Sequence, residues 1–545
     1  MLDFDDGTSL TTLGYDKSSK GNNWTLNNFS LTAGTSYDHM LDVPGNSFAT
    51  LNPLNAGVAP TDGNLKITGA TAHRNVLGTI NLPASGLFYF EGFAPAIQRI
   101  SVGIATSALS LTAVASGQTM FRGCYGDSTG LEVKDGTTTL FSQSAIAAND
   151  VFQIAIDCST GKMWFGRNNT WYNATGSATG NPAGGTNQTW TVSGVTDYAA
   201  ELGVYDSASN SYINFGQSPF HASATYHSAA GGYFRYAPPT GYKALCQRNL
   251  PAPAILNPSS GFKVTLATED NIYSSVASAR SGWPDYVDIL KNRSAAESWA
   301  WQFSHDSSNE YAVSASSLVR QAKRTQSGSN NWVGYSIRIG ATYGTAAGSV
   351  SHTNGAATTI THNVGKSARQ LILLFNRAGG SAVPVYHPDL TSGELLDLCT
   401  TAADAASTAI TSVGTNSFQI GSGVATGTYD YLVCSEISQF FDLGKWTGNA
   451  AADGAYYNAD HKPKMLYAKS LSTTDDHRVY DDLRPGYNVQ GGVVLANTNA
   501  AETTAAEMDI TAFGMKARIT TTPNAAQTYV TASWAAVTGK YSLGR

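Results

Sequence analysis

Short stretches in which hydrophobic and polar residues alternate recur through the first half of the chain. Along Val151–Asp157, for example, Phe152, Ile154 and Ile156 fall on one face of an extended backbone. A two-residue period is typical of a β-strand that buries one face and leaves the other polar. Similar stretches occur at Phe88–Glu91, Ile100–Ile104 and Tyr212–Phe215. Clusters of glycine, asparagine and aspartate separate these stretches at short intervals, so the pattern predicts a β-sandwich.

Helical periodicity is weak along the whole sequence. Only Ala315–Arg324 and the alanine-rich Thr401–Ile410 have the composition for a helical turn or two. The sequence therefore predicts an all-β protein.

A proline-dense stretch interrupts this pattern near the middle of the chain. It begins at Pro238, and three further prolines lie between Leu250 and Ser259. Proline favours an extended backbone, which suits a connector between domains. We therefore predict one domain over residues 1–248 and a connector over residues 249–260.

Three weakly related segments follow the connector. Val287–Arg293 and Leu371–Arg377 each end in an Asn-Arg pair, and Lys464–Lys469 has a related hydrophobic pattern. An interval of roughly 80 to 100 residues fits one small β-sandwich per repeat and is too long for the rung of a solenoid. The sequence therefore predicts three β modules, over residues 261–345, 346–440 and 441–545.

Composition and charge exclude several classes of function. The 545 residues include 33 Lys and Arg against 39 Asp and Glu, which gives a formal net charge of -6. Because the sequence contains no basic run, nucleic acid is not an expected partner. The N-terminus is acidic and unlike a signal peptide, and no apolar stretch approaches the ~18 residues of a membrane span. We therefore expect synthesis in the cytoplasm and no membrane insertion.

The cysteines predict no disulfide framework. Their number is odd and none has CxxC spacing, so we expect reduced thiols that pack mostly in the core. They are Cys124, Cys158, Cys246, Cys399 and Cys434.

Several motifs resemble a known family. Val151–Asp157, Gly161–Trp171 and Tyr212–Phe220 are similar to the hydrophobic-Asp, TGxxWFGxNxxW and NFGQxPF elements of SPRY-type, concanavalin-like sandwiches. Pro238–Pro251 and Leu2–Phe29 resemble the version of this domain found in bacteriophage tail and fibre proteins. The resemblance covers most of the chain and is strongest over residues 1–30, 150–255 and 445–545.

This resemblance implies a concanavalin-like (SPRY) β-sandwich followed by about three smaller β-sandwich modules. It also implies a structural virion protein of a tailed bacteriophage, a tail fibre or tail-tip receptor-binding protein that recognises a glycan or protein on the host cell surface. Such a protein is not an enzyme. Its expected partners are other phage tail proteins and the bacterial receptor, and its expected assembly is a homo-oligomer, with a trimer favoured.

Two alternatives to the tail fibre stay open. Phage fibres usually begin with a separate anchoring domain, whereas this sequence starts almost at the first sandwich strand, which favours a head decoration or head-fibre protein. A polysaccharide depolymerase of the tailspike type would need two facing carboxylates.

Candidate residues for contact with the host surface lie mainly in the Asn/Thr/Gly-rich segment from Asn168 to Gly185. Aromatic side chains stack on sugar rings, and neighbouring Asn and Asp side chains can bind hydroxyl groups. Packing in the core is the competing interpretation for the aromatics, and it is favoured for Trp164. The predicted binding residues are Asn168, Asn169, Trp171, Tyr172, Tyr205 and Asp206.

The sequence predicts no catalytic residues and no cofactor. Acidic pairs such as Asp481-Asp482 are interpreted as solvated turn residues, and neither the HExxH pattern for zinc nor a GxSxG motif occurs. The loop Asp16–Asn23 offers the oxygen ligands that Ca²⁺ prefers, although an Asx-turn without metal accounts for the same residues and is favoured.

Overall fold

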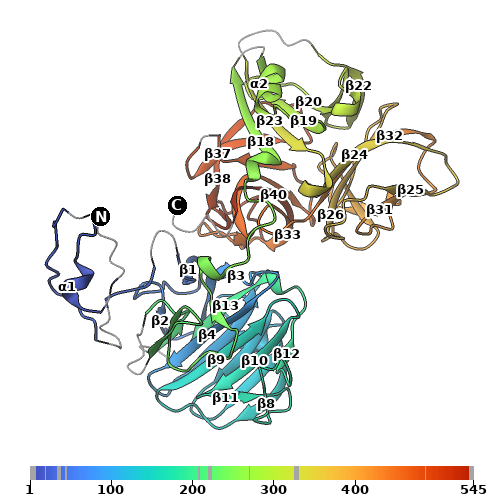
Figure 1. Ribbon diagram of the computed structural model, residues 1–545. Coiled ribbons are helices and arrows are strands. Elements are labelled where there is room, and N and C mark those ends of the chain that lie inside the picture. Colours follow the sequence, from blue (N-terminus) through green and yellow to red (C-terminus); the bar gives the residue numbers. More distant parts are fainter. Residues whose placement is uncertain are drawn as a thin grey trace. The chain divides into compact units, whose positions relative to one another are not determined.

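The structure is a computed structural model that describes residues 6, 8–18, 20–32, 38–42, 46–205, 209–218, 224–268, 271–324, 330–484 and 486–538. The chain divides into two compact units (Figure 1). We call them the sandwich unit, Met1–Pro251, and the three-sheet unit, which begins at Ala252. Strands dominate both units, so the protein is all-β as expected.

Two sheets form the sandwich unit. The first contains, in spatial order, β1 (Leu51–Ala56), β3 (Arg74–Asn81), β13 (Tyr198–Val204), β5 (Ile100–Thr106), β6 (Phe121–Gly126), β7 (Leu131–Asp135) and β8 (Thr138–Gln143). The second contains β11 (Thr170–Tyr172), β10 (Lys162–Arg167), β9 (Asp150–Asp157), β4 (Leu87–Ala94), β14 (Asn210–Asn214) and β2 (Lys66–Thr68), with β12 (Trp190–Thr191) beside β10 and β17 (Lys243–Ala244) beside β4. A separate hairpin contains β15 (Thr225–His227) and β16 (Gly232–Phe234), and a short helix, α1 (Leu10–Leu13), precedes the sheets.

The two sheets pack face to face. Gly92 of β4 lies so near β5 that a Cβ atom at this position would approach the Val102 side chain to 2.3 Å. The Trp190 indole of β12 donates a 2.9 Å hydrogen bond to the carbonyl oxygen of Lys134 in β7. This unit is therefore a concanavalin-like β-sandwich.

Trp164 belongs to the core of the sandwich unit. It is fully buried, and its indole nitrogen donates a 2.9 Å hydrogen bond to the carbonyl oxygen of Thr186. Its ring meets Tyr242 edge-on at 6.4 Å. The prediction that this tryptophan packs in the core is confirmed.

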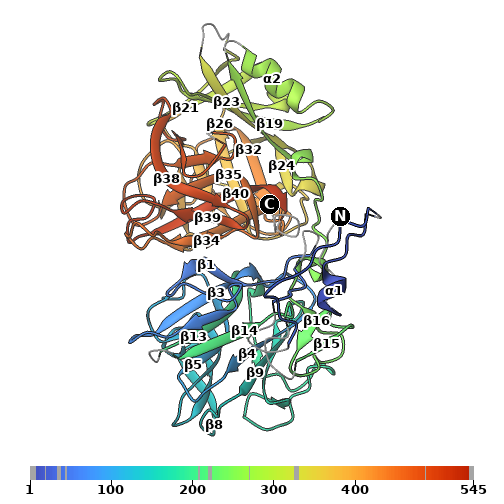
Figure 2. The same cartoon turned by 90° about the vertical axis from the view of Figure 1, so that its left-hand side faces the viewer.

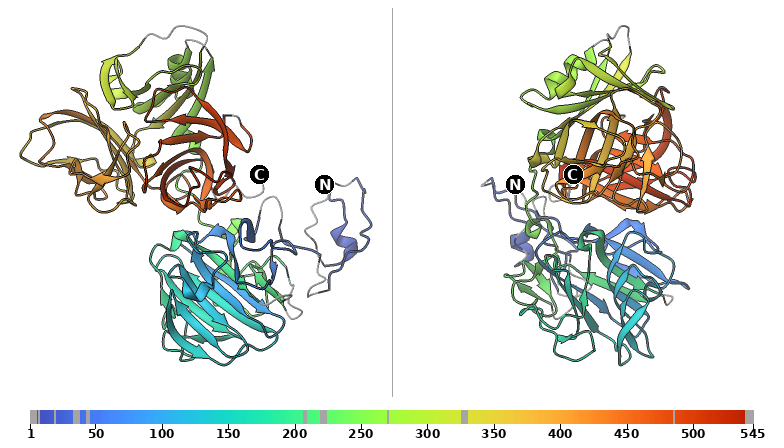
Figure 3. Two further views of the ribbon diagram at one scale, coloured as in Figure 1. Left: turned by 180° about the vertical axis from the view of Figure 1, so that it is seen from behind. Right: turned by 90° about the vertical axis from the view of Figure 1, so that its right-hand side faces the viewer.

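Three large sheets and one small sheet form the three-sheet unit, and Figure 3 shows the three large sheets in green, yellow to orange, and red. In spatial order the first contains β18 (Phe262–Thr268), β23 (Asn331–Arg338), β19 (Tyr286–Asn292), β20 (Trp299–Phe303), β21 (Asn309–Ser314) and β22 (Ser317–Ala322). The second contains β24 (Thr345–His352), β32 (Gly427–Ser435), β26 (Gln370–Asn376), β27 (Pro384–Tyr386), β28 (Glu394–Asp397) and β29 (Ala405–Ala406). The third contains β33 (Phe441–Thr447), β40 (Thr528–Thr538), β35 (His461–Ser470), β36 (Arg478–Asp481), β37 (Gln490–Leu495), β38 (Thr503–Thr511), β39 (Gly514–Ala517) and β34 (Tyr456–Asn458).

The three sheets repeat one arrangement. In each sheet, the strand that comes first in the sequence lies at one edge, and the strand that comes last in the sequence lies next to it. The third place from this edge is taken by β19 in the first sheet, β26 in the second and β35 in the third. The pairing between the second and third positions is also equivalent: Ile289 pairs with Tyr335, Leu373 with Leu432, and Tyr467 with Ala532. The related sequence segments are therefore equivalent strands, and all three strands face one shared hydrophobic core.

Each large sheet also has an outer layer of its own, and Figure 2 shows helix α2 (Ile272–Ala279) beside strands β19 and β23 of the first sheet. Helix α2 packs Ile272 and Val276 against Leu290 of the first sheet. A small sheet of β25 (Thr358–Thr361), β31 (Ser417–Ile420) and β30 (Ile410–Thr411) covers the second. In the third sheet, strands β34, β38 and β39 fold over the face that carries Leu466. The three modules thus share one core and keep separate outer layers.

The two segments with helical composition are not helices. The first contains strand β22, in which Leu318 is buried and Val319 is exposed. The second contains β29 and reaches the first residue of β30. In the described part of the chain the longest helix is α2, and no helix there is long and apolar enough to cross a membrane.

All five cysteines are buried and unpaired. Burial raises the pKa of their thiols, as for Cys399, whose pKa rises to about 12. The expectation of reduced core thiols is confirmed.

Candidate functional site

Two of the predicted contact residues form the tight turn of the β10–β11 hairpin. Asn168 and Asn169 have φ angles of 50° and 67°, and two consecutive left-handed residues are typical of a type I′ turn. The Asn168 side chain accepts a 3.0 Å hydrogen bond from the backbone of Val151 and donates one of 2.7 Å to Asp150. Asn168 therefore holds the hairpin against β9.

Trp171 and Tyr172 lie on strand β11, at the start of the Asn/Thr/Gly-rich segment. The Trp171 ring meets Tyr89 edge-on at 6.3 Å, and Tyr172 stacks on Phe165 at 6.0 Å. Both side chains are half-buried. The short strand pairs both residues with β10, and both rings lie against neighbouring aromatic rings.

Tyr205 lies at the end of β13 in a different part of the sandwich unit. Asp206, its predicted neighbour in the site, lies outside the described residues. Around Tyr205 the structure brings together three side chains that the sequence did not single out: His73, Arg99 and Tyr125. We call these four residues the Tyr205 site.

Strand register explains why these four residues meet. Val204 of β13 pairs with both Arg74 of β3 and Ile100 of β5. Tyr205, His73 and Arg99 are the next residues beyond these three strands at the same end of the sheet, so they lie side by side. Tyr125 of β6 pairs with Ser101. Because paired residues in antiparallel strands point to the same face, all four side chains lie on the outer face of the first sheet.

The Tyr205 site combines aromatic rings with a cation. The rings of His73 and Tyr205 lie 4.4 Å apart, and the Arg99 guanidinium lies 4.5 Å from the centre of the Tyr205 ring. His73 is 6.1 Å from the Tyr125 ring, and Arg99 lies 3.7 Å from an oxygen of Asp127. All four side chains of the site are half-buried and line a shallow depression.

Small and polar residues form the floor of this depression. Gly203 lies between Ser101 and Asn75 in the register of the sheet, and a Cβ atom there would come within 2.1 Å of the Ser101 hydroxyl oxygen and 2.7 Å of the Asn75 amide oxygen. Glycine is therefore required at this position for both polar side chains to keep their places on either side of it. The Asn75 amide also donates hydrogen bonds to the carbonyl oxygens of Ser110 and Ala113, which fixes the β5–β6 connection beside the site.

A buried carboxyl group lies beside this floor, because Glu201 is two residues from Gly203 along β13 and points to the same face of the sheet. Glu201 is fully buried and accepts a 2.8 Å hydrogen bond from Ser101 at one oxygen, while its other oxygen has no hydrogen-bond partner among the described residues. Burial raises the pKa of Glu201 to about 8, although the bond from Ser101 opposes the rise. The side chain is therefore mostly uncharged at neutral pH.

Three acidic residues of the three-sheet unit, Asp389, Asp481 and Asp482, are each bound to a basic side chain. Asp481 is fully buried and bound to Arg484 at 2.6 Å, so the prediction of a solvated turn residue is wrong for it. Asp482 binds Lys464 at 2.7 Å, and Asp389 binds Arg369 at 2.8 Å. These carboxylates stabilise the three-sheet unit through ion pairs.

The loop proposed for Ca²⁺ is organised by an Asx-turn. Asp16 accepts hydrogen bonds from the Ser18 backbone at 2.9 Å and the Ser18 hydroxyl at 2.7 Å, and its own backbone nitrogen donates to Asn23 at 2.9 Å. Among the residues that the structure describes, no group of three or more His, Cys, Asp or Glu side chains is placed to hold a metal ion.

A weak signal for the missed residues is present in the sequence. Arg99 directly precedes the alternating stretch Ile100–Ile104, and His73 directly precedes β3. Residues that flank strands at one end of a sheet are candidates for a common surface, because the strand ends lie side by side. Choosing the correct end requires the strand order, which the sequence does not supply.

Comparisons with known proteins cover different parts of the chain. Residues 323–537 match a family model described as a domain of unknown function (DUF7483). The matched segment begins directly after β22, so it includes only the last strand of the first sheet together with the second and third sheets. No curated protein matches the chain.

Solved SPRY domains are similar to part of the chain. The SPRY domain of human HERC1 is 14% identical, and the match covers 30% of this chain and 96% of that chain with a TM-score of 0.22. The PSpry domain of TRIM65 is 10% identical over 31% of this chain and 89% of its own, with a TM-score of 0.23. A human SPRY domain is 12% identical, and the match covers 31% of this chain and 96% of that domain with a TM-score of 0.21.

Proposed function

We propose that this chain is a structural, non-enzymatic virion protein of a tailed bacteriophage that binds the surface of the host bacterium. A tail fibre or tail-tip receptor-binding protein is the favoured form. The phage assignment rests on the sequence motifs over residues 1–30, 150–255 and 445–545. The contact surface for the host is the Tyr205 site.

The geometry of the Tyr205 site supports this function. Two tyrosine rings and the His73 imidazole form an apolar surface, and the Arg99 guanidinium lies over one ring. The Arg99 guanidinium and the hydroxyl groups of the two half-buried tyrosines supply the polar groups of this surface. Flat apolar surface next to a few fixed polar groups suits a sugar ring and its hydroxyl groups. Strand ends hold these side chains in place, so little conformational entropy is lost on binding.

A single site of this size binds weakly. Several copies of the chain in one homo-oligomer, a trimer in the favoured case, would present several Tyr205 sites to one cell surface. Multivalent contact then gives strong attachment by avidity.

Replacing Tyr125 and Tyr205 by alanine tests the contact surface. We expect the double variant to reduce host adsorption at least tenfold, because two stacking contacts of about 1 kcal/mol each are lost. Purified protein labelled with a fluorophore would be measured on intact host cells, and phage carrying the variant would be measured by adsorption rate. Tyr226→Ala is the control, since Tyr226 is a tyrosine of the same unit that is 51% exposed.

Two results would contradict the proposal. Adsorption equal to that of the Tyr226→Ala control, with an unchanged melting temperature, would remove the Tyr205 site as the contact surface. Electron microscopy of virions with an antibody against the protein tests the location: label at the tail supports the fibre, label on the head supports a decoration protein, and unlabelled virions exclude both.

A further inference from the structure

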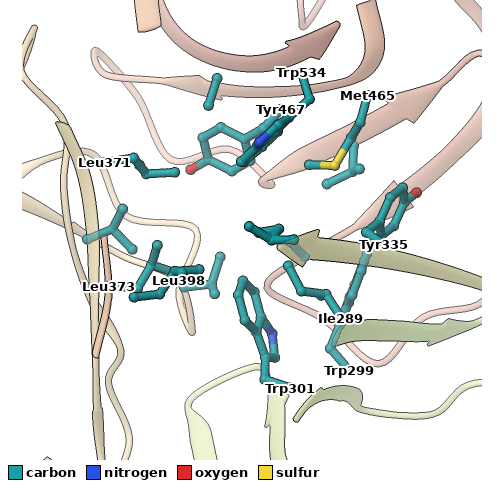
Figure 4. Close-up of a pocket in the computed structure, with 16 residues that line it drawn as sticks. Ile289, Trp299, Trp301, Tyr335, Leu371, Leu373, Leu398, Met465, Tyr467 and Trp534 are labelled. Carbon is teal, nitrogen blue, oxygen red and sulfur yellow. The ribbon is translucent and has the colours of Figure 1, made fainter. Parts of the chain in front are cut away.

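The three sheets of the three-sheet unit enclose an apolar cavity where they meet. Its volume is about 60 Å³. Figure 4 shows side chains from all three sheets converging on this space, with Trp301 and Ile289 on one side and Trp534 and Tyr467 on the other. The cavity therefore lies at the common centre of the repeats.

Equivalent positions of the repeats line the cavity. Each sheet contributes a row of three paired residues, one from each of its three adjacent central strands. The rows are Trp301, Ile289 and Tyr335; Val385, Leu373 and Leu432; and Val479, Tyr467 and Ala532. The third row has the smallest residue, Ala532, at the position where the first has a tyrosine. The hollow follows from this difference in side-chain volume between equivalent positions.

The tyrosine hydroxyl groups of the lining bond outside the cavity, and the one buried side-chain polar atom of the lining left without a hydrogen-bond partner among the described residues is the Trp301 indole nitrogen. The Tyr335 hydroxyl donates to Asp481 at 2.8 Å and accepts from Arg484 at 2.9 Å. The Tyr467 hydroxyl shares a 2.8 Å hydrogen bond with His477. A buried water needs two to four polar partners, and the surface of this cavity is wholly apolar. The cavity is therefore unsuited to water.

We propose that this cavity is a binding site for a small apolar guest, of the size of a xenon atom or a hydrocarbon of one or two carbon atoms. An engineered protein cavity of about 150 Å³ lined by Leu, Ile and Phe side chains binds benzene or xenon. The present cavity has less than half that volume and the same kind of lining, so it admits the smaller guest and excludes benzene. The guest gains dispersion contacts with aromatic and aliphatic side chains that otherwise face empty space.

Crystals of the full chain exposed to xenon gas test the proposal. We expect an anomalous xenon peak between Ile289, Leu373 and Tyr467. Ala532→Leu fills the space, and we expect it to abolish this peak. A cavity without xenon in the wild-type protein, or with ordered water in its place, would overturn the proposal.

A matched pair of variants provides a second test that does not depend on the folding of Ala532→Leu. Leu373→Ala enlarges the cavity, and Leu374→Ala removes the same atoms from the opposite face of the same strand. In benzene vapour we expect density at the central site in Leu373→Ala crystals and none there in the wild type or in Leu374→Ala. Benzene density at the central site in the wild type and both variants, or in none of them, would contradict the assigned size and position of the site.

Discussion

Glu201 places a titratable carboxyl group inside the sandwich unit. Its folded pKa of about 8 lies above the value of about 4.3 expected for the unfolded chain. Between these pH values the unfolded chain has lost a proton that the folded chain keeps. The free energy of unfolding therefore falls as pH rises through this window, by up to about 1.4 kcal/mol per pH unit from this group.

Glu201→Gln is predicted to remove this pH dependence. Glutamine has nearly the same shape, still accepts the hydrogen bond from Ser101, and does not titrate. We expect the variant to be more stable than the wild type at pH 8 and the difference to shrink toward pH 5, as measured by thermal unfolding of the sandwich unit. Glu132→Gln on strand β7, whose side chain is 46% exposed, is the control. Parallel stability curves for Glu201→Gln and the wild type would show that the carboxyl is not neutral in the fold.

The residue scale also shows how far the sequence predicts the candidate site. Tyr205 is a candidate from the sequence because it is an aromatic residue with an aspartate, Asp206, beside it. Its partners His73 and Arg99 are separated from it by more than 100 residues, and they join it only because β3 and β5 both pair with β13. Trp171 was selected by the same reasoning, and there the pairing of β11 with β10 buries half of the side chain. Residue type identified candidates, and strand order decided which of them meet.

At the scale of single elements, the β10–β11 hairpin depends on one asparagine. We predict that Asn168→Ala destabilises the sandwich unit by about 1–3 kcal/mol, because it removes the hydrogen bonds with Val151 and Asp150 and places alanine at a positive φ. Asn169→Gly is the matched control. Its backbone N–H still donates to Gln153, and glycine adopts the φ of 67° without strain. Urea unfolding measures both variants, and equal midpoints would contradict this role for Asn168.

Individual strands are the elements that the sequence predicts best. Val151–Asp157 alternates hydrophobic and polar residues, and it is central strand β9 of the second sheet. Ala315–Arg324 was predicted to be helical from its Ala, Leu and Arg content, yet its centre pairs with β21 as strand β22. Pairing with a neighbouring strand outweighs a weak helical preference. Helix α2 was missed because its Ser-rich sequence lacks a strong helical period.

At the scale of the whole molecule, the three repeats depend on one another. The sequence repeat predicted three modules, and their sheets span residues 262–338, 345–435 and 441–538. The sequence repeat did not predict a shared core. A strand has the same hydrophobic pattern whether its side chains pack against a neighbouring module or inside their own module. Buried hydrogen bonds also cross between sheets: Tyr311 of the first donates to Asp430 of the second, and Tyr335 of the first donates to Asp481 of the third.

This shared core predicts which fragments of the chain fold. A fragment over residues 252–545 retains all three sheets, and we expect it to unfold in one cooperative transition. A fragment limited to residues 323–537, the segment that matches the family model, lacks β18 to β22. It leaves Leu373 and Tyr467 facing solvent where Ile289 and Trp301 would pack. We expect this shorter fragment to bind a hydrophobic dye, to aggregate and to show no cooperative melting transition, because its apolar surface is no longer covered. Calorimetry and dye fluorescence on the two fragments measure the difference. A cooperative transition and low dye binding in the 323–537 fragment would mean that the second and third sheets form a complete core without the first.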